Sequence, residues 1–123
     1  MSTMLDSNRR VVEESIQAIV EGDRKTFIEN HAEDCLLHTG NETVRGIEKI
    51  ADRQFDQAGI TDLELNPKEF IAEGDLVSVR WAVRGTDERT GERFHFMNLG
   101  QFRIEDDSCV EAWIVSSAPN VDG

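Results

Sequence analysis

The chain has 123 residues, a length typical of a single domain that can bury a substantial apolar core. Its 13 Lys and Arg residues are outnumbered by 25 Asp and Glu residues, and the resulting net charge of -12 disfavours phosphate backbones and anionic lipid as partners. The first residues contain no apolar run of signal-peptide length, and no segment approaches the roughly 20 apolar residues of a membrane span. We therefore expect one cytoplasmic domain over residues 1–123 that binds neither nucleic acid nor membrane.

The chain lacks the common sequence patterns of metal, phosphate and dinucleotide sites. It contains no Cys-x-x-Cys, His-Glu-x-x-His, P-loop or Gly-x-Gly-x-x-Gly pattern. Cys35 and Cys109 lie in predicted strands, and without a secretory context we interpret both as buried thiols. We expect no metal and no cofactor.

The first half of the chain is predicted to be mainly helical. Apolar residues at helical spacing predict helices over about 6–21, 23–32 and 46–58. His31 falls near the end of the second helix, and a short strand follows over 35–39. Gly59 is a typical helix stop.

The second half is predicted to be sheet. Alternating apolar residues and turn signals indicate strands over 62–66, 70–72, 76–86, 94–104 and 109–117. Pro67 confines its segment to an edge or a strand end. Three N-terminal helices followed by a curved antiparallel sheet, mixed at one edge, form an α+β arrangement. We expect the sheet to wrap round a long helix as a cone-shaped barrel.

Several motifs, spread over almost the whole chain, resemble a known family in their order and spacing. They are Glu33-Asp34-Cys35-Leu36-Leu37-His38, Arg45-Gly46-Ile47-Glu48-Lys49-Ile50, Ala72-Glu73-Gly74-Asp75-Leu76-Val77-Ser78-Val79-Arg80-Trp81, Gly85-Thr86, Gln101-Phe102-Arg103-Ile104 and Val110-Glu111-Ala112-Trp113. The chain thereby resembles the SnoaL-like polyketide cyclase group of the nuclear transport factor 2-like superfamily. The resemblance implies a cone-shaped α+β fold, commonly a homodimer, with a pocket for a small organic ligand.

The catalytic residues of that superfamily are not found at the matching positions of this chain. Its cyclases carry acidic residues after the tryptophan of the last strand, whereas Trp113 is followed by Ile-Val-Ser-Ser. Its ketosteroid isomerases use a Tyr and two Asp, but this chain has no Tyr, and Thr39 and Gly100 stand at the Asp positions. The last Asp of a limonene-epoxide-hydrolase network would fall near Val115. The resemblance therefore leaves the reaction open.

His38 is the candidate catalytic residue, because the SnoaL-like group often carries a pocket histidine at this position and histidine suits proton transfer at neutral pH. The alternative is a half-buried strand histidine with a backbone hydrogen bond. His31 is interpreted as structural, and His95 as a residue of the outer sheet face. The carboxamide of Asn98 is expected to orient a ligand carbonyl or hydroxyl. The remaining expected pocket residues are Phe55, Trp81, Phe96, Gly100, Phe102 and Trp113.

Two functions are close to equal on these grounds, and whether the chain is an enzyme stays open. The first is cyclase- or isomerase-type proton transfer on an apolar carbonyl compound, with His38 as base. The second is a non-catalytic carrier of a small hydrophobic ligand. An interaction module that uses its sheet face only for assembly is a third alternative, and a homodimer through the outer sheet face is expected in any case. The size of the cavity, and whether His38 points into it, separate these functions.

Overall fold

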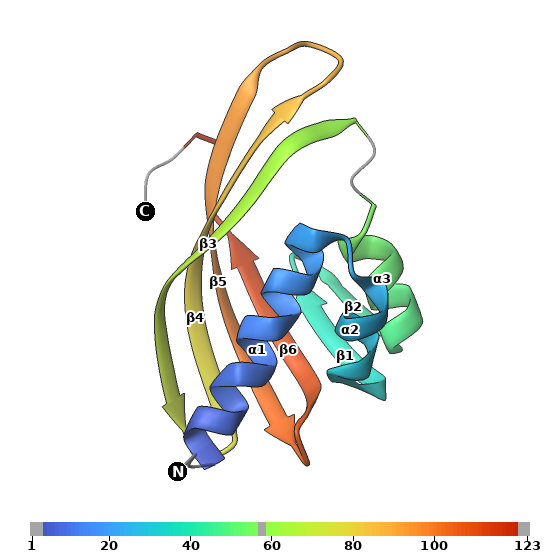
Figure 1. Cartoon of the computed structure of the whole chain (residues 1–123), viewed down its shortest axis with the longest axis vertical. Helices are drawn as coiled ribbons and strands as arrows, with labels where there is room; N and C mark the ends of the chain where they lie inside the picture. Colours follow the sequence, from blue (N-terminus) through green and yellow to red (C-terminus); the bar gives the residue numbers. More distant parts are fainter. Residues whose placement is uncertain (1–3, 57–58, 121–123) are drawn as a thin grey trace.

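The computed structural model describes residues 4–56 and 59–120, which form three helices and a six-stranded sheet (Figure 1). The helices are α1 (Met4–Glu21), α2 (Arg24–Glu29) and α3 (Ile47–Gln54). The strands are β1 (His31–Thr39), β2 (Glu42–Arg45), β3 (Ile60–Glu73), β4 (Leu76–Asp87), β5 (Arg93–Glu105) and β6 (Ser108–Ser116). None of the described helices is long and apolar enough to cross a membrane.

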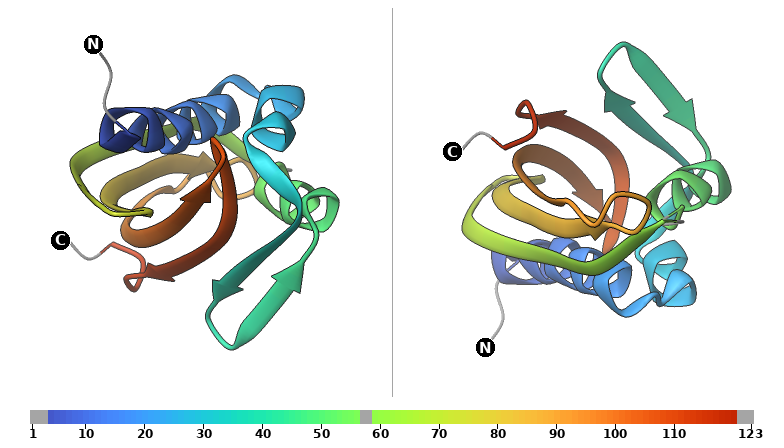
Figure 2. Two further views of the ribbon diagram at one scale, coloured as in Figure 1. Left: turned by 90° about the horizontal axis from the view of Figure 1, so that it is seen from below. Right: turned by 90° about the horizontal axis from the view of Figure 1, so that it is seen from above.

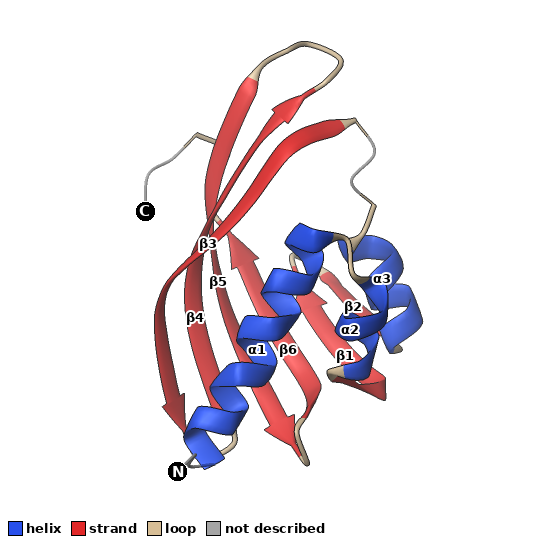
Figure 3. Cartoon of the chain, in the orientation of Figure 1, coloured by secondary structure: helices blue, strands red, loops and turns tan. Residues whose placement is uncertain are grey.

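The strands follow the order β2-β1-β6-β5-β4-β3, and only the pairing of β1 with β6 is parallel. The sheet curves without closing on itself, and the helices all lie on its concave side (Figure 3). Figure 2 shows the long strands curling beneath α1, while β1 and β2 extend to one side. The predicted α+β arrangement with a sheet that is mixed near one edge is confirmed.

The core lies between α1 and the concave face of the sheet. Alternate residues of β4 point into it, and Val77, Val79, Trp81 and Val83 are all at most 5% exposed. This confirms the face that the alternation predicts. Val12 and other apolar residues of α1 pack against these strands, and each such fully buried side chain contributes roughly 1.5–3 kcal/mol to the free energy of unfolding.

The structure differs from the sequence prediction where α2 gives way to β1. The helix ends at Glu29, and Asn30 is its C-terminal cap. The Cys109 N–H donates to the Asn30 carbonyl oxygen at 2.9 Å, and His31 pairs in register with Cys109. Strand pairing with β6 therefore outweighs the local helical pattern, so that His31 is the first residue of β1. At the other end of the helical region α3 ends at Gln54, and residues 57–58 of the predicted helix lie outside the described residues.

Both edges of the sheet also differ from the prediction. The strands expected on either side of Pro67 form one edge strand, β3, whose register shifts between Pro67 and Glu69. The edge position that Pro67 indicates is confirmed, because a proline there needs no ladder donor. At the opposite edge, Glu42–Arg45 forms β2, where the sequence analysis predicts no strand.

Candidate functional site

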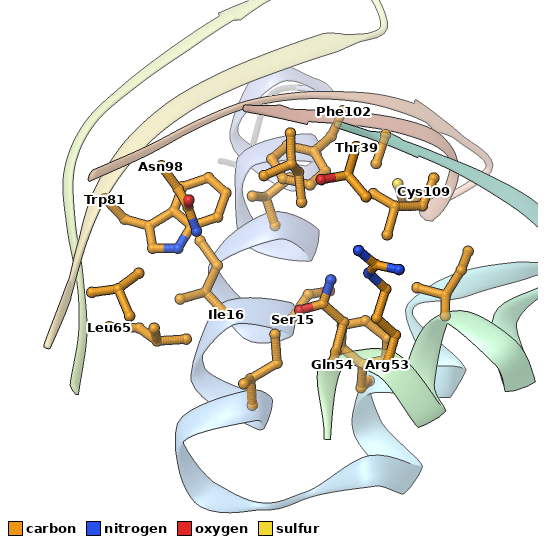
Figure 4. Close-up of a pocket in the computed structure, with 18 of the residues that line it drawn as sticks. Ser15, Ile16, Thr39, Arg53, Gln54, Leu65, Trp81, Asn98, Phe102 and Cys109 are labelled. Carbon is orange, nitrogen blue, oxygen red and sulfur yellow. The ribbon is translucent and has the colours of Figure 1, made fainter. Parts of the chain in front are cut away.

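A cavity of about 330 Å³ lies between the concave face of the sheet and the helices (Figure 4). This volume falls within the usual range for sites that bind small molecules. Most of its wall is apolar: Val11, Val12, Ile16, Ile19, Phe27, Leu37, Ile50, Ile60, Leu63, Leu65, Trp81, Val83, Phe94, Phe96, Phe102, Ala112 and Ile114.

Polar groups interrupt this wall at a small number of positions. They are Ser15, His31, Cys35, Thr39, Arg53, Gln54, Asn98, Cys109 and Ser116. Among the described residues, no Asp or Glu lines the cavity. The carboxylates on which acid–base chemistry often depends are thus absent from this lining, and the charge that the lining does carry is positive.

His31 holds a fixed tautomer in its neutral form. Its Nδ1 lies 2.6 Å from the carbonyl oxygen of Phe27, and a carbonyl only accepts, so Nδ1 carries the hydrogen. The other ring nitrogen, Nε2, then carries the lone pair of the neutral ring. Burial lowers the pKa of His31, against the smaller opposing effect of that hydrogen bond. His31 is therefore a neutral proton acceptor at physiological pH, with its ring packed 4.3 Å from that of Phe27.

Asn98 and Ser116 form a polar pair on neighbouring strands. They are partners in the register of β5 and β6, and the Ser116 hydroxyl donates to Oδ1 of Asn98. The Nδ2 group of Asn98 supplies two N–H donors. Because β6 runs from Cys109, the partner of His31, to Ser116, the two polar ends are separated by roughly 20 Å along the strand. A small ligand can therefore contact His31 or Asn98, and only an elongated one can reach both.

Arg53 projects from the last turn of α3 into the cavity, beside Gln54 and across from Thr39 (Figure 4). Its Nη1 donates to Glu42 Oε2 at 2.7 Å. The side chain of Arg53 is 46% exposed, which places it at the rim of the cavity.

Both cysteines line the cavity as buried free thiols, as predicted. A hydrogen bond with Cys35 and then burial raise the pKa of Cys109, so that its thiol stays protonated. Cys109 thus provides no reactive thiolate. Among the described residues, no cluster of three or more His, Cys, Asp or Glu side chains is placed to hold a metal ion.

The structure places His38 on the opposite face of the sheet from the cavity. Leu37 points inward and is 2% exposed, so its neighbour points outward. His38 Nε2 lies 2.7 Å from Glu111 Oε2, and its Nδ1 lies 3.0 Å from Thr43 Oγ1. Its ring stacks on Trp113 at 5.4 Å. The family resemblance predicted that His38 lies in the pocket. Because successive side chains of β1 point to opposite faces of the sheet, His38 points away from the cavity instead.

The other expected pocket residues divide into two groups. Asn98, Trp81, Phe96 and Phe102 line the cavity. Phe55, Gly100 and Trp113 are not among its lining residues.

Each residue of the second group has a clear structural setting. Phe55 packs edge-on against Phe27 at 5.4 Å, and Trp113 lies on the outer face beneath the guanidinium of Arg103 at 5.6 Å. Gly100 is buried, and a Cβ there would come within 2.8 Å of the rings of Trp81 and Phe102. Its lack of a side chain accommodates these protein rings, which are themselves the cavity wall.

Sequence reasoning missed His31, Thr39 and Arg53 as cavity residues. The alternation through Cys35 and Leu37 puts Thr39 on the inner face and was the signal for that residue. No pattern in the sequence distinguished Arg53 from other surface arginines, and His31 was assigned to a helix.

A curved α+β sheet with an apolar cavity beneath its first helix can enclose a small molecule. The model of the SnoaL-like domain family matches residues 12–112, and the chain belongs to this family. No curated protein sequence matches the chain.

Solved structures support the same fold. A protein from Jannaschia sp. CCS1 that is named as a SnoaL-like polyketide cyclase has a TM-score of 0.85 at 19% sequence identity, covering 95% of this chain and 90% of that one. IdmH from Streptomyces antibioticus, which is named as a polyketide cyclase, has a TM-score of 0.80 at 28% identity, covering 89% and 91%. An LEH-like epoxide hydrolase from M. tuberculosis has a TM-score of 0.80 at 18% identity, covering 94% and 86%. Proteins of different activities thus share this fold, which leaves the activity of this chain to its own residues.

Proposed function

We propose that the chain binds a small, largely apolar organic molecule in the cavity beneath α1. The observation that carries this proposal is the cavity itself, which is large enough for such a ligand and has an apolar wall with a few polar groups. The likeness to polyketide cyclases is consistent with a carbon-rich ligand.

Two neighbouring positions of β6 provide the test. Ile114 lines the cavity, and Val115 points outward and is 62% exposed. We expect Ile114→Trp to fill the cavity and weaken binding of the neutral probe 2-naphthamide, measured by isothermal titration calorimetry, by tenfold or more. Val115→Trp should leave the affinity unchanged. Equal affinities for the wild type and both variants would show that the probe binds elsewhere.

Acid–base catalysis in the cavity is the second candidate function, and His31 is the residue that favours it. With Nε2 bare and the ring neutral, His31 can take a proton from a carbon next to a carbonyl group, and the C–H electrons then move to the carbonyl oxygen as an enolate forms. His38 lies on the other side of the sheet, where its Nε2 faces Glu111, so it cannot act as the base inside this cavity. A catalytic role for His38 elsewhere stays a prediction. If His31 transfers no proton, the chain is a non-catalytic carrier.

A generic carbon acid tests this second candidate without knowledge of the natural substrate. In 5-nitrobenzisoxazole, removal of the C3 proton by a base breaks the N–O bond and releases a coloured phenolate. We expect His31→Gln, which can still donate to the Phe27 carbonyl oxygen, to abolish the rate above background, whereas His38→Gln should keep it. If His38→Gln loses the rate and His31→Gln keeps it, the catalytic base is His38 on the outer face of the sheet.

We also propose that the chain forms a homodimer through the outer face of the sheet. Leu99 and Val115 are register partners on this face and are 54% and 62% exposed. Exposed apolar side chains that adjoin one another in this way mark interaction surfaces.

A further inference from the structure

The charge of the cavity lining is opposite in sign to that of the protein as a whole. The chain has a net charge of -12, and its field opposes the approach of anions. Among the described lining residues, however, the permanently charged side chain is Arg53, and none of these residues is an Asp or Glu. A ligand that enters the cavity therefore meets a cation at the rim and an apolar wall behind it.

The geometry of Arg53 leaves it able to bind a second anion. Its Nη1 is engaged by Glu42, whereas a guanidinium has five N–H donors arranged as a planar fork. The Arg53–Glu42 ion pair is exposed, at 46% and 61%, so it holds the guanidinium only weakly in competition with another carboxylate.

Neutral polar groups surround the same part of the rim. The end of β1 brings Thr39 close to Glu42, its register partner; Gln54 lines the cavity beside Arg53, and Thr39 lines it across from Arg53 (Figure 4). A hydroxyl and a carboxamide next to a guanidinium can accommodate the oxygen atoms of a carboxylate group.

The geometry points to an apolar organic acid as the ligand. Its carboxylate binds Arg53 at the rim, and its hydrocarbon part lies against the apolar wall that Leu65 and Trp81 help to form. This assignment rests on the proposed function, that is, on the binding of a small molecule in this cavity, and adds the chemical class of that molecule.

Two probes of nearly equal shape test the assignment by isothermal titration calorimetry. 2-Naphthoate carries a carboxylate, and 2-naphthamide carries a neutral carboxamide at the same position. We expect the wild type to bind the naphthoate about fivefold to tenfold more tightly, a ratio that fits a partly exposed charge-assisted hydrogen bond. Arg53→Gln should remove this preference while leaving the affinity for the naphthamide within twofold of its original value.

Three further variants sharpen the result. Glu42→Gln removes the competing carboxylate and should strengthen naphthoate binding, opposite in sign to the effect of Arg53→Gln. Arg53→Lys keeps the charge and should keep most of the preference. Lys49→Gln, one turn earlier on α3, removes the same charge from an exposed position outside the cavity lining and should change neither affinity by more than twofold.

The outcomes separate this assignment from the proposed function. If the wild type binds both probes equally and Arg53→Gln changes neither affinity, the ligand class is wrong and the cavity remains a binding site. If Lys49→Gln weakens naphthoate binding as much as Arg53→Gln does, the preference is a general charge effect and the role of Arg53 is also wrong. If neither probe binds at millimolar concentration, both proposals fail together.

Discussion

Gly100 shows how a single position shapes the cavity wall. It lies in the middle of β5 on the inner face, and the rings of Trp81 and Phe102 close over it. Both rings line the cavity, so the space that a side chain would take at Gly100 is already occupied by the wall.

We predict that Gly100→Ala destabilises the fold by about 1–3 kcal/mol, because the new Cβ overpacks this inner face. Urea unfolding measures the change, and Gln101→Ala, on the exposed outer side of the same strand, serves as the control. A Gly100→Ala variant as stable as the wild type would mean that the rings can move aside without loss of packing.

His31 should make the stability depend on pH. Burial lowers its pKa in the folded protein below the ordinary value of 6.5. Between the folded pKa and 6.5 the unfolded chain binds more protons, so this contribution to stability is complete above about pH 6.5 and is lost as the pH falls through the folded pKa. The slope is at most about 1.4 kcal/mol per pH unit.

His31→Gln should remove that slope, because glutamine does not titrate and can still donate to the Phe27 carbonyl oxygen. Urea unfolding of both proteins from pH 5 to pH 8 measures the difference. If the wild type and the variant lose stability in parallel over this range, another group causes the dependence.

The face of the sheet to which a side chain points could be predicted from the sequence where apolar and polar residues alternate strictly. Val79 and Trp81 of β4 lie on the core face that the alternation along this strand predicts. His38 was assigned by family resemblance against its strand parity, and the structure places it outside. A family resemblance indicates roughly where along a strand a site residue lies. An error of one residue in that placement moves the side chain to the opposite face of the sheet.

Among the elements, α2 depends most on its cap. Asp23 accepts from the Thr26 backbone N–H at 3.1 Å and from the Thr26 hydroxyl at 2.6 Å. These hydrogen bonds, the hydroxyl first, lower the pKa of Asp23. A six-residue helix has little stability of its own, so the cap and the packing of Phe27 determine whether it forms.

We predict that Asp23→Ala lowers the free energy of unfolding through loss of this cap. Glu21→Ala, an exposed residue two positions earlier, is the control in the same chemical-denaturation experiment. A loss equal to that of the control would show that Phe27 packing alone maintains α2.

The elements that sequence reasoning located least well are those whose ends depend on distant strands. Asp23 is a local signal and caps α2 where the sequence predicts a helix to begin, whereas α3 ends at Gln54, before the stop that Gly59 indicates. The start of β1 is set by the hydrogen bond from Cys109 to Asn30, from a strand almost 80 residues away. β2 exists because β1 provides an edge with which it can pair, and no local pattern in the sequence indicates such a partner.

At the scale of the whole molecule, the sheet separates two surfaces with different roles. The concave face carries the cavity, and the convex face carries the hydrogen bond between His38 and Glu111 and the ion pair of Glu111 with Arg103. The succession of helices and then sheet, and the family, were predictable because they rest on periodicity and on motif spacing over the whole chain. The composition of the cavity was not, since it depends on which residues the curved sheet and α3 bring together, as Arg53 and Thr39 illustrate.

The last prediction concerns the convex face. If this face joins two copies of the chain, Leu99 and Val115 are buried in the dimer, and a charge there is desolvated without a partner. Leu99→Lys should therefore yield a folded monomer in analytical ultracentrifugation, at concentrations where the wild type is a dimer.

Val20→Lys is the control, since Val20 is an exposed apolar residue of α1 on the other side of the sheet, at 38% exposure. A wild type that sediments as a monomer, or a Leu99→Lys variant that stays dimeric, would contradict an interface at this face. Because the cavity lies on the concave side of the sheet, the monomeric variant should also keep the probe affinity of the wild type, so that assembly and ligand binding are measured independently.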